Sequence, residues 1–278
     1  MSGPVLVGVD GSTTSMAAVE AAAREADRMG VGLRLAYACG WPAARVAPGI
    51  APWDPDGIRA DGSAGPAHGG LTEAVRRARG VAPGVRVTRA VLMGEPATVL
   101  ESESHRASLT VVGSRPPARS GSGRRRGSVA ARLAVHGGSP VLMVRGRPDP
   151  DGPVLLACDD GHLGRRAAEF AFAEASARGT DVVVLNGFAA RNGRTRGRSD
   201  DPLAALRKRY PDVTVHRPRV RGGTRRAVVE ASTSARLVVI GTRRRGGWSA
   251  ALPATVGRTA LRRAGCPVAV IPDERGDR

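Results

Sequence analysis

Aromatic residues are scarce in this chain. Phenylalanine, tryptophan and tyrosine make up 3% of its 278 residues, whereas apolar residues as a group make up 41%. The hydrophobic cores must therefore consist mainly of Val, Leu, Ile and Ala, a composition that suits parallel sheets covered on both faces. The shortage of aromatic rings also removes the stacking surfaces on which many RNA-binding domains hold bases.

Long apolar segments are missing as well. No stretch approaches the ~18 apolar residues that a membrane-spanning helix needs. The opening sequence MSGPVLVGVDGS has no basic start, and its apolar run is too short for a secretory signal. We therefore expect a cytoplasmic protein without contact with a membrane.

Cysteine and histidine are few and are not grouped as metal ligands. The three cysteines, Cys39, Cys158 and Cys266, are odd in number and show no C-x-x-C spacing. This pattern argues against a disulfide framework and against a zinc site. The five histidines are scattered, with no pair at i and i+4, so a metal centre built on histidine is not expected.

Acidic residues are outnumbered by basic ones, which gives a net charge of +18 and a pI near 11.6. Lys208 is the only lysine, so the positive charge is almost entirely arginine. An arginine excess that accompanies an excess of Ala and Gly is what a genome-wide coding bias produces. Nucleic-acid binding is therefore not favoured, and an anion-binding or RNA-binding function ranks behind the two hypotheses given at the end of this section.

The chain contains the same unit twice. Corresponding residues include Asp10 and Asp159, Gly30 and Gly179, Gly94 and Gly223, and Gly113 and Gly241. The offset falls from 149 to 127 residues along the unit, mostly between residues 38 and 94, where a Pro- and Gly-rich stretch tolerates insertions. The length and the repeat together predict two domains, residues 1–147 and 152–278, joined by a linker around residues 146–153.

Apolar periodicity predicts that strands alternate with helices in each half. In the first half the expected strands are 5–9, 33–38, 85–92, 109–112 and 141–144, and the helices are 13–29, 71–79, 95–105 and 127–136. In the second half they are strands 154–158, 182–185, 213–215, 237–240 and 268–271, and helices 163–178, 202–210, 224–232 and 256–263. This alternation indicates parallel β-α-β units and predicts two tandem doubly wound α/β domains with five-stranded sheets.

Two segments fall at the carboxyl edge of the predicted sheets, where ligands of open parallel sheets bind. The first is Asp10-Gly11-Ser12, directly after the first strand. Its carboxylate can accept hydrogen bonds from a base or a ribose. Asp and Ser are equally typical of a helix N-cap, so both interpretations stand.

The second segment, residues 113–129, follows the fourth strand. Its glycines allow backbone N–H groups to converge on an anion, and Ser128 would stand at a helix N-terminus. Three arginines precede it at positions 124–126. A solvated loop has the same Gly/Ser/Arg composition, so this segment alone does not decide between an anion site and a plain connection.

Several motifs taken together resemble the universal stress protein family. They are VLVGVDGS near the start, GEPA, VVGS, GSVAARLAVHGGSPVLMVR, and in the second half LVVIGT and CPVAVIP. The resemblance implies flavodoxin-like sheets of strand order 3-2-1-4-5 and, in some members, ATP bound through G-x-x-G-x9-G-[S/T]. It also implies pairing through the last strands, 141–144 and 268–271, within one chain, and further assembly as a homodimer is compatible with it.

Carried onto the first repeat, the family pattern matches Gly113, Gly127 and Ser128, but Pro117 replaces its second glycine and Pro116 adds a residue. Proline removes an N–H donor, so the phosphate end of the pattern is less complete than the base and ribose end. The resemblance implies the following nucleotide-binding residues: Val9, Asp10, Gly11, Ser12, Ala38, Gly113, Ser114, Arg115, Gly127, Ser128 and Val129.

The second repeat departs further from the pattern. Arg244 and Ala254 stand where the family has glycines, and each adds a Cβ at a position of close phosphate approach. The residues that match there, or that adjoin a match, are Asp159, Gly241, Thr242, Thr255 and Val256. The first repeat is therefore the better candidate for a nucleotide site.

The leading hypothesis is a cytoplasmic tandem universal stress protein that binds ATP, with or without magnesium, and regulates a stress response. Neither a Ser-His-Asp set nor a Cys-His or carboxylate pair repeats at the strand ends, so an enzyme is not expected. The replaced glycines in both repeats motivate the main alternative, a scaffold that binds a protein partner and no nucleotide.

Overall fold

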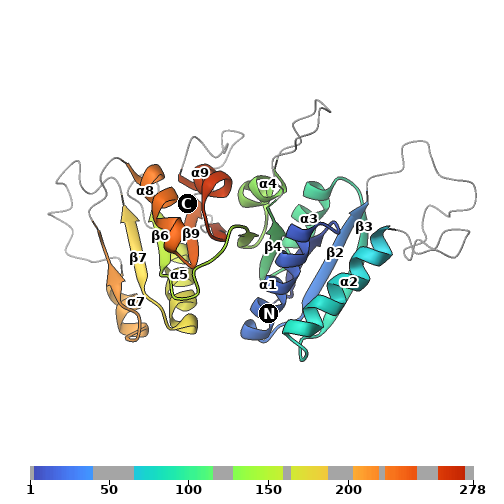
Figure 1. The fold of residues 1–278 in the computed structure, drawn as a ribbon, viewed down its shortest axis with the longest axis horizontal. Coiled ribbons are helices and arrows are strands. Elements are labelled where there is room, and N and C mark those ends of the chain that lie inside the picture. Colours follow the sequence, from blue (N-terminus) through green and yellow to red (C-terminus); the bar gives the residue numbers. More distant parts are fainter. Residues whose placement is uncertain are drawn as a thin grey trace, which may run out of the picture. The chain divides into compact units, whose positions relative to one another are not determined.

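The structure is a computed structural model, and it describes residues 3–39, 66–114, 128–158, 164–186, 203–218, 223–242 and 256–272. The chain forms two compact units, Met1–Val144 and Arg145–Arg278. Each unit is an α/β layer structure in which helices lie against a parallel sheet (Figure 1).

The first unit is a five-stranded sheet with the order β3-β2-β1-β4-β5. Its elements are β1 (Val5–Val9), α1 (Thr13–Met29), β2 (Leu33–Cys39), α2 (Pro66–Val81), β3 (Val87–Met93), α3 (Pro96–Ser104), β4 (Leu109–Gly113), α4 (Val129–His136) and β5 (Val141–Val144). All of its neighbouring strands are parallel, and Val5 of β1 pairs with Leu33 on one side and Leu109 on the other.

The second unit repeats this topology with the order β8-β7-β6-β9-β10. Its elements are β6 (Val154–Cys158), α5 (Arg165–Arg178), β7 (Val182–Asn186), α7 (Ala204–Arg209), β8 (Val215–His216), α8 (Thr224–Ala231), the short 3-10 helix η2 (Ser232–Ser234), β9 (Leu237–Thr242), α9 (Val256–Arg263) and β10 (Val268–Pro272). Its strand pairs are parallel too. The expected doubly wound fold of order 3-2-1-4-5 is therefore confirmed in both repeats.

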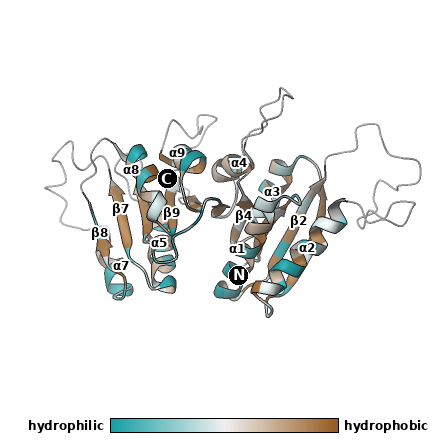
Figure 2. Cartoon of the chain, in the orientation of Figure 1, coloured by the Kyte–Doolittle hydropathy of each residue, from teal (hydrophilic) through white to brown (hydrophobic). Residues whose placement is uncertain are grey.

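Helices cover both faces of each sheet. In the first unit α1 packs beside α2, whereas α3 packs beside α4 on the opposite face. The central strands are largely apolar, as Figure 2 shows by their colour, and Val5, Val7 and Val111 are fully buried. The core is aliphatic, as the composition predicted, and Phe172 is the one aromatic residue among its largest fully buried side chains in the described chain.

Local signals place some boundaries well and others poorly. Gly30 and Gly179, matched by the repeat, both end their helices in the left-handed conformation with φ of 64° and 61°. In contrast, α2 begins at Pro66, five residues before the predicted start at Leu71. The prediction was late because Gly69 and Gly70, near the start of the helix, are poor helix formers. Strand β8 spans only two residues, and the predicted strand residue Val213 lies outside it.

A buried serine closes the same loop in both units. Ser104 Oγ donates to the Glu101 carbonyl at 2.6 Å and accepts from the Gly138 N–H at 2.8 Å. In the second unit Ser232 Oγ donates to a carbonyl at 2.7 Å and accepts from the Gly265 N–H at 2.9 Å. Both serines are completely buried. This bond ties the end of α3 or α8 to the loop that enters the last strand.

The segment after β5 packs within the second unit. Arg145 Nη1 donates to the Leu261 carbonyl at 2.7 Å, close to the C-terminal end of α9, where a cation is favourable. The Asp149 N–H donates to the Ala235 carbonyl at 3.2 Å. Residues 145–153 are neither helix nor strand, as the linker composition predicted. In the part of the chain that the structure describes, no helix is long and apolar enough to cross a membrane.

We expect Ser104→Ala to destabilise the first unit by about 1–2 kcal/mol, because it removes both hydrogen bonds of a completely buried hydroxyl, including the one that the Gly138 N–H donates to it. Urea denaturation followed by circular dichroism measures the change. Ser102→Ala, on the exposed face of α3, is the matched control and should change stability by less than about 0.5 kcal/mol. Equal effects of the two substitutions would contradict the role assigned to Ser104.

Candidate functional site

The turn after β1 is held by its own side chains. Asp10 Oδ1 accepts from the Ser12 N–H at 3.0 Å and from the Ser12 hydroxyl at 2.6 Å. Ser12 is the N-cap of α1, and its Oγ accepts from the Ser15 N–H at 3.2 Å. Gly11 permits the turn through a φ of 79°. The helix-cap interpretation of Asp10-Gly11-Ser12 is therefore correct: Ser12 is the N-cap, and the hydrogen bonds that Asp10 accepts from Ser12 hold it in place.

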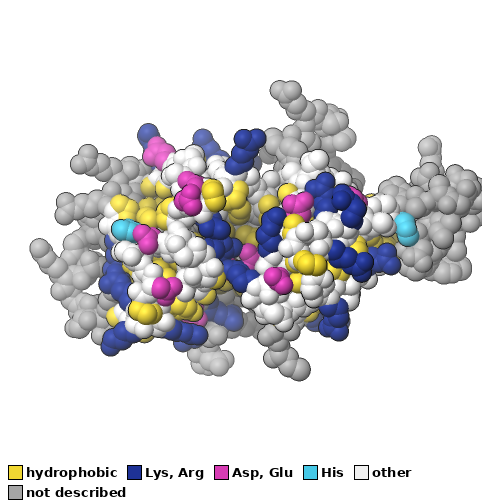
Figure 3. Space-filling view, turned by 60° about the horizontal axis from the view of Figure 1, so that its bottom comes forward, with side chains coloured by type: hydrophobic (Ala, Val, Ile, Leu, Met, Phe, Trp, Pro, Cys, Tyr) yellow, Lys and Arg dark blue, Asp and Glu magenta, His cyan; other side chains and the backbone are white. Residues whose placement is uncertain are grey.

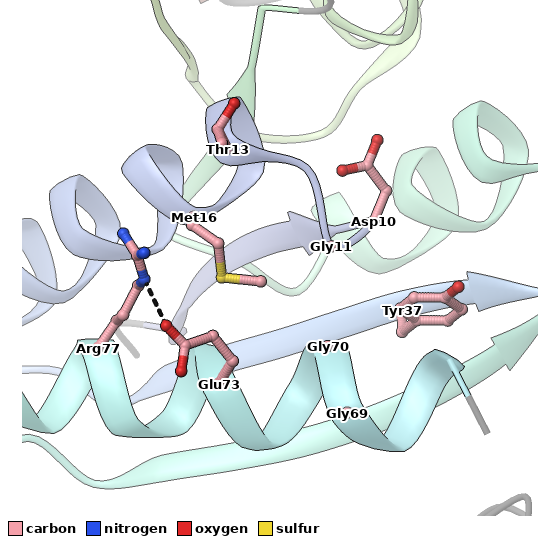
Figure 4. A pocket seen from close by; sticks show the side chains of 9 residues that line it. All are labelled: Asp10, Gly11, Thr13, Met16, Tyr37, Gly69, Gly70, Glu73 and Arg77. Carbon is pink, nitrogen blue, oxygen red and sulfur yellow. Dashed lines mark hydrogen bonds and ion pairs between the residues drawn. The ribbon is translucent and has the colours of Figure 1, made fainter. Parts of the chain in front are cut away.

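The same arrangement places Asp10 at the surface. Asp10 is exposed, and it directly follows β1, the strand at which the order of the sheet reverses. In Figure 4 its carboxylate lies beside the turn that joins β1 to α1. Bracing the turn fixes the position of this carboxylate, so the structural role and a binding role are compatible.

Gly113 and Gly241 have a packing role that needs no ligand. A Cβ on Gly113 would lie 2.5 Å from the Thr14 carbonyl oxygen, so the first turn of α1 can approach the end of β4 only because residue 113 is glycine. At Gly241 a Cβ would lie 3.2 Å from Ala167 Cβ in α5. These two glycines thus allow the first helix of each unit to pack closely against the fourth strand of that unit.

Ala38 lies on the face of the sheet that α3 covers. Gly8 is on this face, since a Cβ there would lie 2.9 Å from Leu100 in α3. Gly8 pairs with Ala36, and strand residues two apart share a face, so Ala38 follows on the same side. Tyr37, which pairs with Val9, belongs to the opposite face, beneath α1 and α2.

The remaining predicted residues do not form one cluster in sequence or secondary structure: they lie at helix starts, at strand ends or outside the described residues. Ser128 is the exposed N-cap of α4, and its Oγ accepts from the Ala131 N–H at 3.4 Å. The Ser114 N–H donates to the Val144 carbonyl at 2.9 Å and so extends the β4–β5 pairing. Val129 begins α4, Thr242 ends β9, and the buried Val256 begins α9. Four predicted residues, Arg115, Gly127, Asp159 and Thr255, lie outside the described residues, as do Pro116, Pro117, Arg244 and Ala254.

A cavity of about 450 Å³ opens between α1 and α2. Nine residues line it: Asp10, Gly11, Thr13, Met16, Tyr37, Gly69, Gly70, Glu73 and Arg77. Figure 4 shows Asp10 and Tyr37 at one end, the Glu73–Arg77 pair at the other, and Met16 between them. Sequence reasoning found Asp10 and Gly11 but missed the other seven. The glycine pair inside a helix was the available signal.

Charges at the far end of the cavity are paired. Glu73 accepts from Arg76 through both its oxygens at 2.7 Å, and from Arg77 Nε at 2.8 Å. These arginine hydrogen bonds lower the pKa of Glu73 to about 2. Arg77 also donates to Glu20 of α1 at 3.0 Å and thereby joins the two helices. At the other end, burial raises the pKa of Tyr37, so its phenol is protonated near neutral pH.

The structure assigns no metal site to the residues it describes, where no group of three or more His, Cys, Asp or Glu side chains comes together. Cys39 is half-buried and Cys266 is buried, and both are free thiols. Burial raises the pKa of Cys266 to about 12, which makes it a poor nucleophile.

Basic side chains of the described residues form no single patch on the face that Figure 3 draws. On that face they lie scattered among acidic and apolar side chains in both units. Several arginines pair with glutamates of their own helix, such as Arg226 with Glu230 at 2.6 Å.

Comparison with known proteins agrees with the fold and the motifs. The model of the universal stress protein family matches residues 1–145 and 189–272, so the chain belongs to this family. Universal stress protein Rv2623 of Mycobacterium tuberculosis is 30% identical, and the match covers 96% of this chain and 95% of that protein. A universal stress protein of Mycolicibacterium smegmatis is also 30% identical, with 96% of each chain covered.

Among solved structures, a universal stress protein from Archaeoglobus fulgidus DSM 4304 has a TM-score of 0.63 at 16% identity and covers 98% of both chains. This similarity shows that the tandem fold is shared. A universal stress protein in complex with cAMP matches only 52% of this chain, and its TM-score of 0.39 is too low to transfer a binding mode.

We expect Gly113→Ala to destabilise the first unit by about 1–3 kcal/mol, because its Cβ pushes α1 away from β4. The control is Gly80→Ala in α2, where a Cβ meets no atom within 4 Å. That substitution should stabilise the protein by up to about 1 kcal/mol, the difference in helix propensity. Urea denaturation measures both, and a neutral Gly113→Ala would show that the close approach of α1 is dispensable.

Proposed function

We propose that this tandem universal stress protein binds ATP at the carboxyl edge of the first unit and acts as an ATP-responsive regulator of a stress response in the cytoplasm. It binds the nucleotide without chemical turnover. Magnesium accompanies the ATP phosphates rather than occupying a protein site of its own.

One observation carries the proposal: the turn after β1 holds an exposed Asp10 carboxylate at the switch point of the sheet. In doubly wound sheets this is where ligands bind. The Asp10 brace on Ser12 leaves the carboxylate at the surface, where it can accept hydrogen bonds from ribose hydroxyls or the base. Ala38, on the α3 face beside this edge, supplies an apolar contact for adenine.

The phosphates belong at the N-terminus of α4. Ser128 caps this helix, and its neighbours present N–H groups that have no partner inside the helix. The second unit keeps Asp159, but it carries Arg244 and Ala254 in place of two glycines of the motif. We therefore assign the nucleotide to the first unit.

The proposal extends to assembly. The last strands, β5 and β10, are short and apolar, and β10 is buried along its whole length. An apolar strand at the edge of a sheet favours association. We propose that these two strands pair edge to edge, within one chain or between two copies in a homodimer.

Equilibrium dialysis with labelled ATP and magnesium tests the function. The wild-type chain should bind saturably, and Asp10→Asn should bind at least tenfold more weakly, because it removes the charge while its Oδ1 still accepts from Ser12. Ser128→Ala should weaken binding as well. Asp27→Asn, an exposed site in the last turn of α1, is the control and should bind like the wild type.

Absence of saturable binding by the wild type would contradict the nucleotide assignment. A protein partner retained on the immobilised chain equally well with and without ATP would then support the scaffold alternative that the replaced glycines motivate. Equal weakening by Asp10→Asn and Asp27→Asn would place the nucleotide elsewhere.

A further inference from the structure

We propose that the exposed surface of α8 and α9 in the second unit is a docking surface for an acidic segment of a partner protein. The two helices pack side by side against strands of the second sheet (Figure 1). The proposed nucleotide site belongs to the first unit, so docking at α8 and α9 does not depend on it.

Every exposed residue of these two helices is charged. They are Arg225, Arg226, Glu230, Arg258, Arg262 and Arg263, and the other residues of both helices are buried or half-buried. The single acidic residue is already paired, because Arg226 donates to Glu230 at 2.6 Å. Figure 2 shows the hydrophilic residues on both helices. We call the five arginines together the α8–α9 arginine surface.

The basic composition of the chain does not account for this concentration. Helices α3 and α4 are the counterparts of α8 and α9 in the first repeat. Their exposed residues are Thr98, Ser102, Arg132 and His136, with a single arginine among them. An arginine excess that arose from composition alone would affect equivalent helices alike. The second repeat therefore gathers arginine at a place where the first does not.

The stability of the two helices does not account for it either. Arg225 and Arg226 lie in the first turn of α8, and Arg258 lies in the first turn of α9, where the helix dipole disfavours cations. Arg262 follows Arg258 by four residues, a spacing at which like charges repel. In contrast, the three basic residues of α7 are in its last turn, where a cation is favourable. An anionic partner would offset the repulsion on α8 and α9.

The chemistry of the surface favours carboxylates as the anions. Guanidinium groups bind carboxylates through two parallel hydrogen bonds. Neither helix contains an aromatic residue on which a base could stack, and neither exposes an apolar residue that could enter a membrane. The net charge of +18 opposes a second copy of this chain as the occupant. An acidic segment of another protein fits these conditions.

Fluorescence polarisation with a fluorescein-labelled oligoglutamate peptide tests the surface on the full chain. The wild type should bind the peptide saturably without nucleotide, and more weakly as salt is added. The triple variant Arg258→Gln, Arg262→Gln, Arg263→Gln should bind at least tenfold more weakly. Glutamine has nearly the helix propensity of arginine, so α9 should be kept. The titration contains no ATP, so its outcome is independent of the proposed nucleotide site.

The matched control removes the same charge from α7 in the same unit. Its triple variant Arg207→Gln, Lys208→Gln, Arg209→Gln replaces three exposed residues and should change the affinity for the peptide less than twofold. Equal weakening by the α7 and α9 variants would show that overall charge alone attracts the peptide, and would overturn the proposal.

A second variant covers the case in which the α9 variant fails to fold. Arg225→Gln with Arg226→Gln, on α8, should weaken peptide binding at least fivefold. Single-stranded DNA and phosphatidylserine vesicles serve as competing probes. If either binds the wild type more tightly than the peptide and loses this binding in the arginine variants, the surface recognises phosphate groups, and the assignment to a protein partner is wrong. No saturable peptide binding by the wild type would contradict it as well.

Discussion

The close approach of the first helix to the fourth strand is the constraint on which the rest of each unit depends. In the first unit Gly113 allows the Thr14 carbonyl to lie against the end of β4, and Gly241 plays the same part in the second. This contact fixes the start of α1, and therefore the turn that carries Asp10. A position required for packing thus also sets the geometry of the carboxyl edge.

The carboxyl edge borders a different feature on each face of the sheet. On the α3 face, Gly8 and Ala38 lie beside the proposed nucleotide site, and the phosphate end of that site is the N-terminus of α4. On the α1 and α2 face, the cavity ends at the same turn and extends past Tyr37 to the arginine-held Glu73. Asp10 stands at the boundary between the two, because the strand it follows is the centre of the sheet.

Sequence patterns predicted the fold well because its signals are local. The apolar run of β1 and the caps Ser12 and Gly30 define β1 and α1 to the residue, and the repeat transferred the topology to the second unit. The start of α2 was missed because Gly69 and Gly70 are poor helix formers and interrupt the helical pattern, and the cavity was missed because its lining comes from segments far apart in the chain. Periodicity also could not show that residue 113 must be glycine to make room for the Thr14 carbonyl, because the two residues are far apart in the chain.

Nitrogen-15 amide NMR during a titration with ATP and magnesium examines the central claim most directly, because it reports where along the chain the nucleotide acts. The account predicts that the amides of Gly11, Ser114 and Val129 shift together and saturably, while those of Gly69, Gly70 and Gly241 stay in place. Shifts confined to the second unit, or no saturable shift at the Asp10 turn, would contradict it.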